Sequence, residues 1–77
     1  MKVKSVCAKL ERKGYAVRQE DEIEMIASKE SCDPIQILFN KESEDVECLF
    51  TRNEFPKTVD RAICLSEGRR IRWRVSR

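Results

Sequence analysis

The stretch IQILFNKESEDVECLFT, residues 35–51, decides the fold because it predicts a β-hairpin. Two runs rich in β-branched and aromatic residues, 35–40 and 46–51, flank the charged segment KESED, which is typical of a turn. In both runs apolar side chains recur at every second position, as in strands with two unlike faces. Because these runs are the most apolar in the chain, we place both strands in the centre of an antiparallel sheet.

The alternation divides the side chains of this hairpin between two faces. One face carries Ile35, Ile37, Phe39, Val46, Cys48 and Phe50. Leu38 and Leu49 fall on the other face. We therefore expect these two leucines to point away from the core, where they could anchor a protein partner.

A second hairpin and two helices surround these strands. Residues 15–28 alternate apolar and polar side chains around the acidic segment QEDE and predict the hairpin. Residues 2–13 predict a helix that ends at Gly14 and carries the apolar stripe Val3, Val6, Cys7 and Leu10. A second helix is expected over about residues 56–67, with its start uncertain between Asn53 and Thr58, Pro56 in the first turn and Gly68 at its end. Its buried face is expected to carry Phe55, Val59, Ala62, Ile63 and Ser66.

The last segment, GRRIRWRVSR at residues 68–77, alternates strictly. Ile71, Trp73 and Val75 face one way and Arg70, Arg72 and Arg74 the other, which predicts a strand with a core face that includes Trp73. The element order is then α-β-β-β-β-α-β. We expect a single α+β domain, residues 1–77, with an antiparallel sheet of four to five strands packed on two helices.

Charge is segregated along the chain although the net charge is only +2. Residues 1–17 carry five basic and one acidic side chain, and residues 55–77 carry seven and two. Residues 18–54 between them carry four basic and eleven acidic side chains. Such asymmetry marks a partner surface, or else basic and acidic elements pair with one another inside the fold.

Several kinds of chemistry lack their residues. The chain has no histidine, and its four cysteines form no C-x-x-C pair, so we expect no metal site. The two glycines stand at predicted helix ends, which leaves no glycine-rich phosphate loop. We therefore expect no cofactor and no enzymatic activity. Cys64, on the polar side of the second helix, is the best candidate for an exposed thiol.

The location follows from what the first residues lack. The segment MKVKSVCAKL has no uninterrupted apolar region of the kind found in signal peptides. No apolar run approaches the roughly 20 residues of a membrane span. The cysteines are therefore expected to be reduced, and the expected location is the cytoplasm.

The arginines of the last segment raise the main functional question. On a strand, Arg70, Arg72 and Arg74 would stand about 6.8 Å apart, close to the phosphate repeat of a nucleic-acid strand. The predicted nucleic-acid-binding residues are Arg69, Arg70, Arg72, Arg74, Arg77, Lys4, Lys9, Arg12 and Lys13. The alternatives are a charged edge strand with no ligand, and a protein-interaction module or homodimer that uses the charged faces with Leu38 and Leu49.

Overall fold

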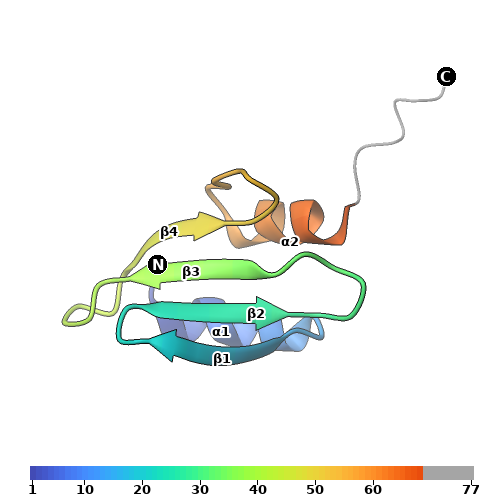
Figure 1. The fold of residues 1–77 in the computed structure, drawn as a ribbon. Helices are drawn as coiled ribbons and strands as arrows, with labels where there is room; N and C mark the ends of the chain where they lie inside the picture. The colour runs from blue at the N-terminus through green and yellow to red at the C-terminus, as the bar shows by residue number, and fades with distance from the viewer. Residues whose placement is uncertain (69–77) are drawn as a thin grey trace, which may run out of the picture.

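The computed structural model describes residues 1–68 and arranges them as two helices on one face of a four-stranded antiparallel sheet (Figure 1). The elements follow in the order α1 (Val3–Arg12), β1 (Ala16–Asp21), β2 (Glu24–Ser28), β3 (Ile35–Phe39), β4 (Val46–Phe50) and α2 (Val59–Glu67). The expected α+β class is therefore confirmed. The strand expected after α2, with Trp73 and its arginines, lies outside the described residues.

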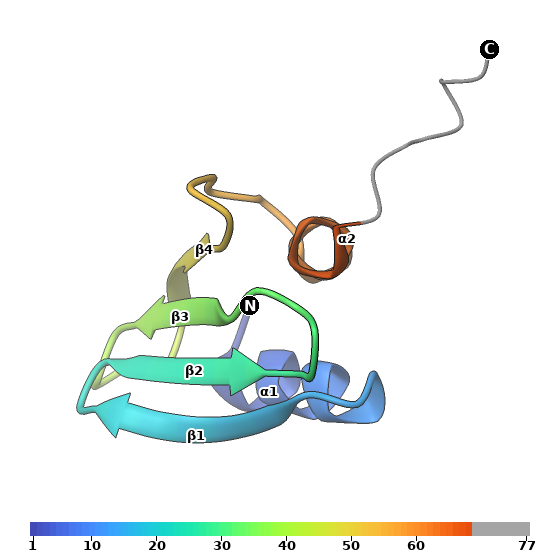
Figure 2. The same ribbon diagram turned by 45° about the vertical axis from the view of Figure 1, so that its right-hand side comes forward.

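The core lies between the helices and the inner face of the sheet. Figure 2, in which α2 is seen nearly end-on, places α1 toward β1 and β2 and α2 toward β3 and β4. The buried side chains of these elements are Val3, Val6 and Leu10 of α1, Ala27 of β2, Ile35, Ile37 and Phe39 of β3, Leu49 of β4, and Val59, Ala62 and Ile63 of α2. The apolar stripes predicted for α1 and β3, and that of α2 apart from Phe55, are thus the ones that pack, and each large side chain contributes about 1.5–3 kcal/mol by its burial.

The predicted end of the first helix is confirmed. Gly14 has a φ of 94°, in the left-handed region, and its N–H donates to the carbonyl of Glu11. The next N–H, that of Tyr15, donates back to the carbonyl of Leu10. This pair of bonds satisfies the last helical carbonyls and reverses the chain, so that Tyr15 enters the core at the start of β1.

A buried set of polar contacts joins three segments that are distant in sequence. The hydroxyl of Tyr15 donates to Ser66 Oγ at 2.9 Å, and Ser66 Oγ donates to the carbonyl of Asp33 at 2.6 Å. The N–H of Asp33 in turn donates to the carbonyl of Ser66. Because Tyr15 and Ser66 are both buried, these bonds fix the end of α2 against the start of β1 and the β2–β3 loop.

β4 departs from the expected alternation at a β-bulge. Phe39 pairs with Val46 while Leu38 pairs with Cys48, which leaves Glu47 as the extra residue of β4. Val46 still packs against the core, but the additional residue reverses the phase of the strand beyond it. Cys48 and Phe50 therefore turn to the open face.

The expectation for Leu49 is therefore wrong. Leu49 pairs with Ile37 on the inner face and is only 3% exposed. Leu38 does lie on the open face, where it is half-buried. The two leucines stand on opposite faces and do not form one apolar anchor.

The placement of β4 in the centre of the sheet is also wrong for the described residues. The strand order β1-β2-β3-β4 gives the central positions to β2 and β3. The apolar side chains of β4 are explained by α2, which covers its inner face. The apolar composition of β4 therefore reflects the helix that covers the strand and not a central position in the sheet.

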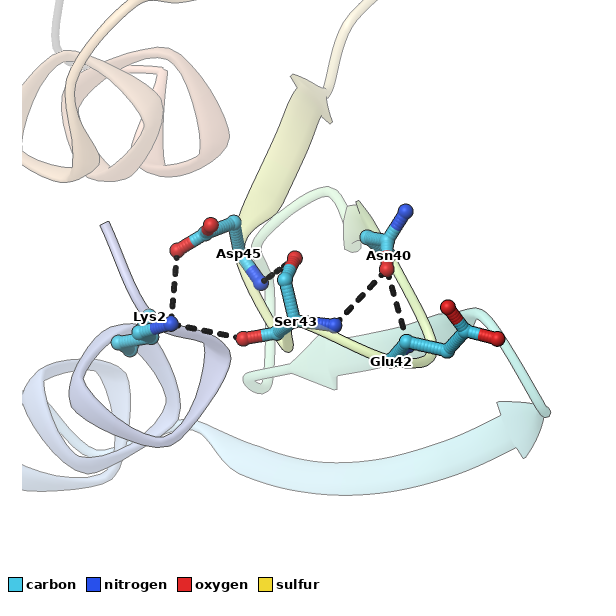
Figure 3. Close-up of polar contacts among 5 residues, drawn as sticks. All are labelled: Lys2, Asn40, Glu42, Ser43 and Asp45. Atoms are coloured by element: carbon cyan, nitrogen blue, oxygen red, sulfur yellow. Dashed lines mark hydrogen bonds and ion pairs between the residues drawn. The ribbon is translucent and has the colours of Figure 1, made fainter.

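The first residues of the chain cover the start of β4 (Figure 3). The N–H of Val46 donates to the carbonyl of Met1, and Lys2 Nζ donates to the carbonyl of Ser43 at 2.7 Å. Lys2 also pairs with Asp45 at 3.1 Å and holds the pKa of that carboxyl below its usual value. The turn itself is closed by Asn40 Oδ1, which accepts N–H bonds from the two residues Glu42 and Ser43.

The second helix begins later than expected. Thr58 is its N-cap, and Thr58 Oγ1 accepts from the N–H of Arg61 at 3.1 Å. Pro56 therefore precedes the helix instead of standing in its first turn. Phe55 precedes it too and is 68% exposed, so its assignment to the buried helix face is wrong.

The first hairpin differs from expectation at its tip. Ile23, within the predicted hairpin, lies in the turn between β1 and β2 and not on a strand, and it is 48% exposed. A register irregularity between Gln19 and Asp21 accompanies this turn. Ile26 lies on the open face, because it pairs with Gln36.

We predict that Thr51→Val stabilises the protein. Thr51 is 1% exposed, and its Oγ1 has no hydrogen-bond partner among residues 1–68. Removal of this unsatisfied hydroxyl should raise the free energy of unfolding in urea by about 1 kcal/mol. Thr58→Val is the matched control, because it removes a bonded N-cap and should lower the same quantity by about 1 kcal/mol. Equal losses in both variants would contradict the prediction.

We also predict that the protein loses stability above about pH 10 through Tyr15, the single tyrosine of the chain. Burial raises the pKa of Tyr15, so at alkaline pH the unfolded chain releases this proton before the folded chain does. The unfolded state is favoured as pH rises through that range. Tyrosinate absorbance should therefore appear together with loss of the circular dichroism signal. Its appearance near pH 10 in a still-folded protein would show that Tyr15 is not shielded.

Candidate nucleic-acid interface

The structure separates the basic residues predicted on the first helix. Lys4 lies at the beginning of α1, whereas Arg12 and Lys13 are exposed at its end. Lys9 is half-buried and pairs with Asp60 of α2 at 3.2 Å, so it joins the two helices. The predicted residues Arg69, Arg70, Arg72, Arg74 and Arg77 lie outside the described residues.

Arg12 and Lys13 nevertheless lie at the end of the molecule where α2 also ends. A Cβ placed on Gly14 would be 3.5 Å from Cε of Lys29, and Lys29 Nζ pairs with Glu67 at 3.1 Å. Glu67 accepts a hydrogen bond that raises the pKa of Lys29 and keeps it cationic. Gly68, from which the arginine-rich residues continue, follows directly. The cations Arg12, Lys13 and Lys29 thus lie at the end of the fold where α2 ends.

Arg52, which the sequence analysis did not select, adds a further cation at this end. A Cβ on Gly68 would stand 3.2 Å from Nη1 of Arg52. Arg52 Nε pairs with Asp33 at 3.4 Å, although both side chains remain about half exposed. Such an exposed pair contributes little to stability, and the guanidinium keeps donors for other ligands.

A tight turn gives Arg52 its position. The N–H groups of Thr51 and Glu54 each donate to the carbonyl of the other, at 3.1 and 2.9 Å. Arg52 and Asn53 between them have φ values of 50° and 59°. Positive φ at both central residues is the signature of a type I′ turn, which matches the twist of paired strands and favours asparagine.

The same turn brings two phenylalanines together. Phe50 and Phe55 are the residues on either side of the Thr51–Glu54 pair, and their ring centroids are 4.9 Å apart with an angle of 50° between the planes. Phe55 is largely exposed, and Phe50 is half-buried on the open face of the sheet. They form an aromatic surface in which one ring is supported by the other.

A hollow on the open face adjoins this aromatic pair. It has a volume of about 270 Å³, and Ile26, Pro34, Gln36, Phe50 and Arg52 are among its lining residues. Gln36 Nε2 donates to Glu24 Oε2 at 2.9 Å, and Arg52 pairs with Asp33. Asp33, Thr51 and Asn53 complete the lining, so polar groups stand beside the apolar surface of Ile26, Pro34 and Phe50.

The sequence contained one signal for this pair. The residue before a proline is disfavoured in the helical region, and Phe55 precedes Pro56. The spacing of Phe55 from Val59 suggested a helix face instead. The aromatic pair was not predicted because the helical spacing of Phe55 and Val59 was given more weight than the proline that follows Phe55.

The cysteines do not form a site in the described part of the chain. Cys7, Cys32, Cys48 and Cys64 are free and half-buried, so their burial class does not set Cys64 apart from the other three. Burial, with a smaller effect of Glu11, raises the pKa of Cys7 and disfavours its thiolate. Within residues 1–68 no three Cys, Asp or Glu side chains gather closely enough to hold a metal ion.

Comparisons of the chain with protein-family models, with curated proteins and with solved structures found no match. Neither helix in residues 1–68 is long and apolar enough to cross a membrane.

We predict that the type I′ turn tolerates glycine but not a branched side chain at position 53. Asn53→Val should lower the free energy of unfolding by about 1–2 kcal/mol, because the left-handed conformation is costly for such residues. Asn53→Gly should change it by a few tenths of a kcal/mol or less. Urea denaturation measures both. Equal stability of the two variants would show that the positive φ is not a constraint.

Proposed function

We propose that the protein is a non-enzymatic module that binds single-stranded nucleic acid. One observation carries the proposal. Phe50 lies on the open face and packs against the exposed ring of Phe55, and Arg52, in the turn between them, lies next to the glycine from which the arginine-rich residues 69–77 continue. Aromatic faces and arginines in one place are what unpaired bases and their phosphates require.

Each group has a separate physical role in this proposal. An exposed ring stacks on any base, because every base has a π face, and one such contact contributes about 1–3 kcal/mol. The arginines neutralise phosphates, which supplies affinity that falls steeply with salt. Arg12 and Lys13, which are exposed at the end of α1, add two cations on the side of the sheet where the helices lie.

The aromatic pair favours single strands over duplexes. In a duplex the base faces are occupied by neighbouring bases, so Phe55 would find no partner and binding would depend on cations alone. The affinity for a single strand should therefore exceed that for a duplex of the same length. This preference distinguishes the proposal from general attraction of a basic segment to phosphate.

A protein partner or a second copy of the chain is the other candidate. It is favoured by the half-buried Ile26 and Leu38, which share the open face with Phe50. Apolar side chains gathered on one face mark interaction surfaces. Leu49 contributes nothing to this candidate because it is buried.

The proposal is tested by titrating labelled single-stranded RNA and DNA, and matched duplexes, at about 50 and 200 mM salt. Contact with three to five phosphates of a single strand predicts that the salt increase weakens binding roughly 20- to 130-fold. Phe55→Ala should weaken binding roughly 5- to 140-fold at constant salt. The triple change Arg70→Ala, Arg72→Ala and Arg74→Ala should instead flatten the dependence on salt.

Ile23→Ala is the matched control, because Ile23 is also a largely exposed apolar residue but lies in the β1–β2 turn. It should leave the affinity unchanged. Circular dichroism establishes that each variant is folded. The proposal fails if no strand binds at low salt, or if Phe55→Ala and Ile23→Ala have equal effects. A change of oligomeric state in Phe55→Ala or Leu38→Ala would then favour the second candidate.

A further inference from the structure

A groove lies on the other side of the molecule, between α1 and the inner face of the sheet. It has a volume of about 560 Å³, which is within the range of ligand sites, about 300–1,000 Å³. Its floor is apolar and consists of Val3, Cys7, Ala8, Met25 and Phe39. Its rim is polar and consists of Lys4, Glu11, Gln19, Glu22, Lys41 and Glu44.

The groove adjoins a free strand edge. β1 pairs with β2 on one side, and on its other side it has no strand partner among residues 1–68 (Figure 1). The residues of this edge are exposed except for Val17, which is half-buried. A free edge presents unpaired N–H and C=O groups that another strand can bind.

The rim carries three carboxylates, Glu11, Glu22 and Glu44, and two cations, Lys4 and Lys41, so its net charge is −1. Glu22 is neutralised by Lys41 at 2.9 Å. In the described part of the chain, Glu11 and Glu44 form no ion pair, and Glu11 stands in the last turn of α1, where a negative charge is unfavourable. α1 begins beside Glu44, because the N–H of Val3 donates to the carbonyl of that residue. The two carboxylates therefore lie toward opposite ends of the groove.

We propose that β1 and this groove bind an extended segment of another protein as an additional strand, with apolar side chains in the groove and basic side chains at its ends. Backbone bonds to the free edge of β1 would supply affinity. Alternate side chains, about 6.8 Å apart, would enter the groove beside Gln19 of β1 and Ala8 of α1. Basic residues at the ends of that row match Glu11 and Glu44. The site is separate from the aromatic pair, so it does not depend on the proposed nucleic-acid binding.

The test uses the full chain and a synthetic peptide, Lys-Ser-Val-Ser-Leu-Ser-Lys, with amide shifts recorded by nuclear magnetic resonance. Its inward row has lysine at both ends, so it fits either strand direction. The expected shifts are confined to residues 16–21 of β1 and to the groove-lining residues of α1. A peptide with glutamate in place of both lysines should bind at least about tenfold more weakly, and so should one with proline in place of the valine.

Two variants of the same helix form a matched pair. Ala8→Glu places a carboxylate in the groove and should weaken peptide binding by about tenfold. Ser5→Glu places the same side chain on an exposed position of α1 outside the groove and should have no effect. If Ala8→Glu does not fold, Glu11→Gln serves instead, because it removes one rim charge at an exposed position and should weaken binding of the lysine peptide only.

Three outcomes would overturn the proposal. The first is no shift in β1, or equal binding of the lysine and glutamate peptides. The second is a change in the emission of Trp73, the single tryptophan, when Ala8→Glu is introduced without peptide, because the groove would then be filled by the chain itself. The third is a dimer that Ala8→Glu dissociates, since a second copy would then be the occupant.

Discussion

The contact of Tyr15 with Ser66 and of Ser66 with Asp33 is the constraint on which the rest of the arrangement depends. It is buried, it has defined geometry, and it joins the end of α2 to the start of β1 and to the loop before β3. Apolar burial would allow a short helix to slide along the sheet, whereas a hydroxyl pair in the core permits one position. That position places Gly68 beside Arg52, at the end of the molecule where Arg12 and Lys13 also lie.

The parts of the fold that could be predicted are those in which one residue pattern has one physical cause. Ile35, Ile37 and Phe39 alternate because β3 is central and covered on one face. Gly14 ends α1 because the reversal requires a positive φ there. In β4 the alternating pattern was misleading, because Glu47 looks like any exposed strand residue. It is the extra residue of the bulge, so each side chain after it points to the face opposite the expected one.

In the candidate site, too, some residues could be predicted from the sequence and others could not. The charges of Arg12 and Lys13 could be selected from the sequence because a cation at a helix end is exposed in nearly any fold. Their position near the end of α2 could not, because it depends on where α2 is fixed. The aromatic pair depends on a two-residue turn, and Arg52 is an unusual residue at a positive φ. Tertiary pairing across that turn, and not local preference, places Phe50 against Phe55.

Because of the bulge in β4, the orientation of the side chains in this strand depends more on the number of residues in the strand than on which residue stands at position 47. A substitution at Glu47 changes one exposed side chain, but loss of that residue would exchange the two faces of the remaining strand. Cys48 and Phe50 would then enter the interior and Leu49 would leave it. The number of residues in β4 therefore determines which side chains face the interior and which face the candidate binding surface. Natural variants of this protein should accept substitutions at position 47 but not its deletion.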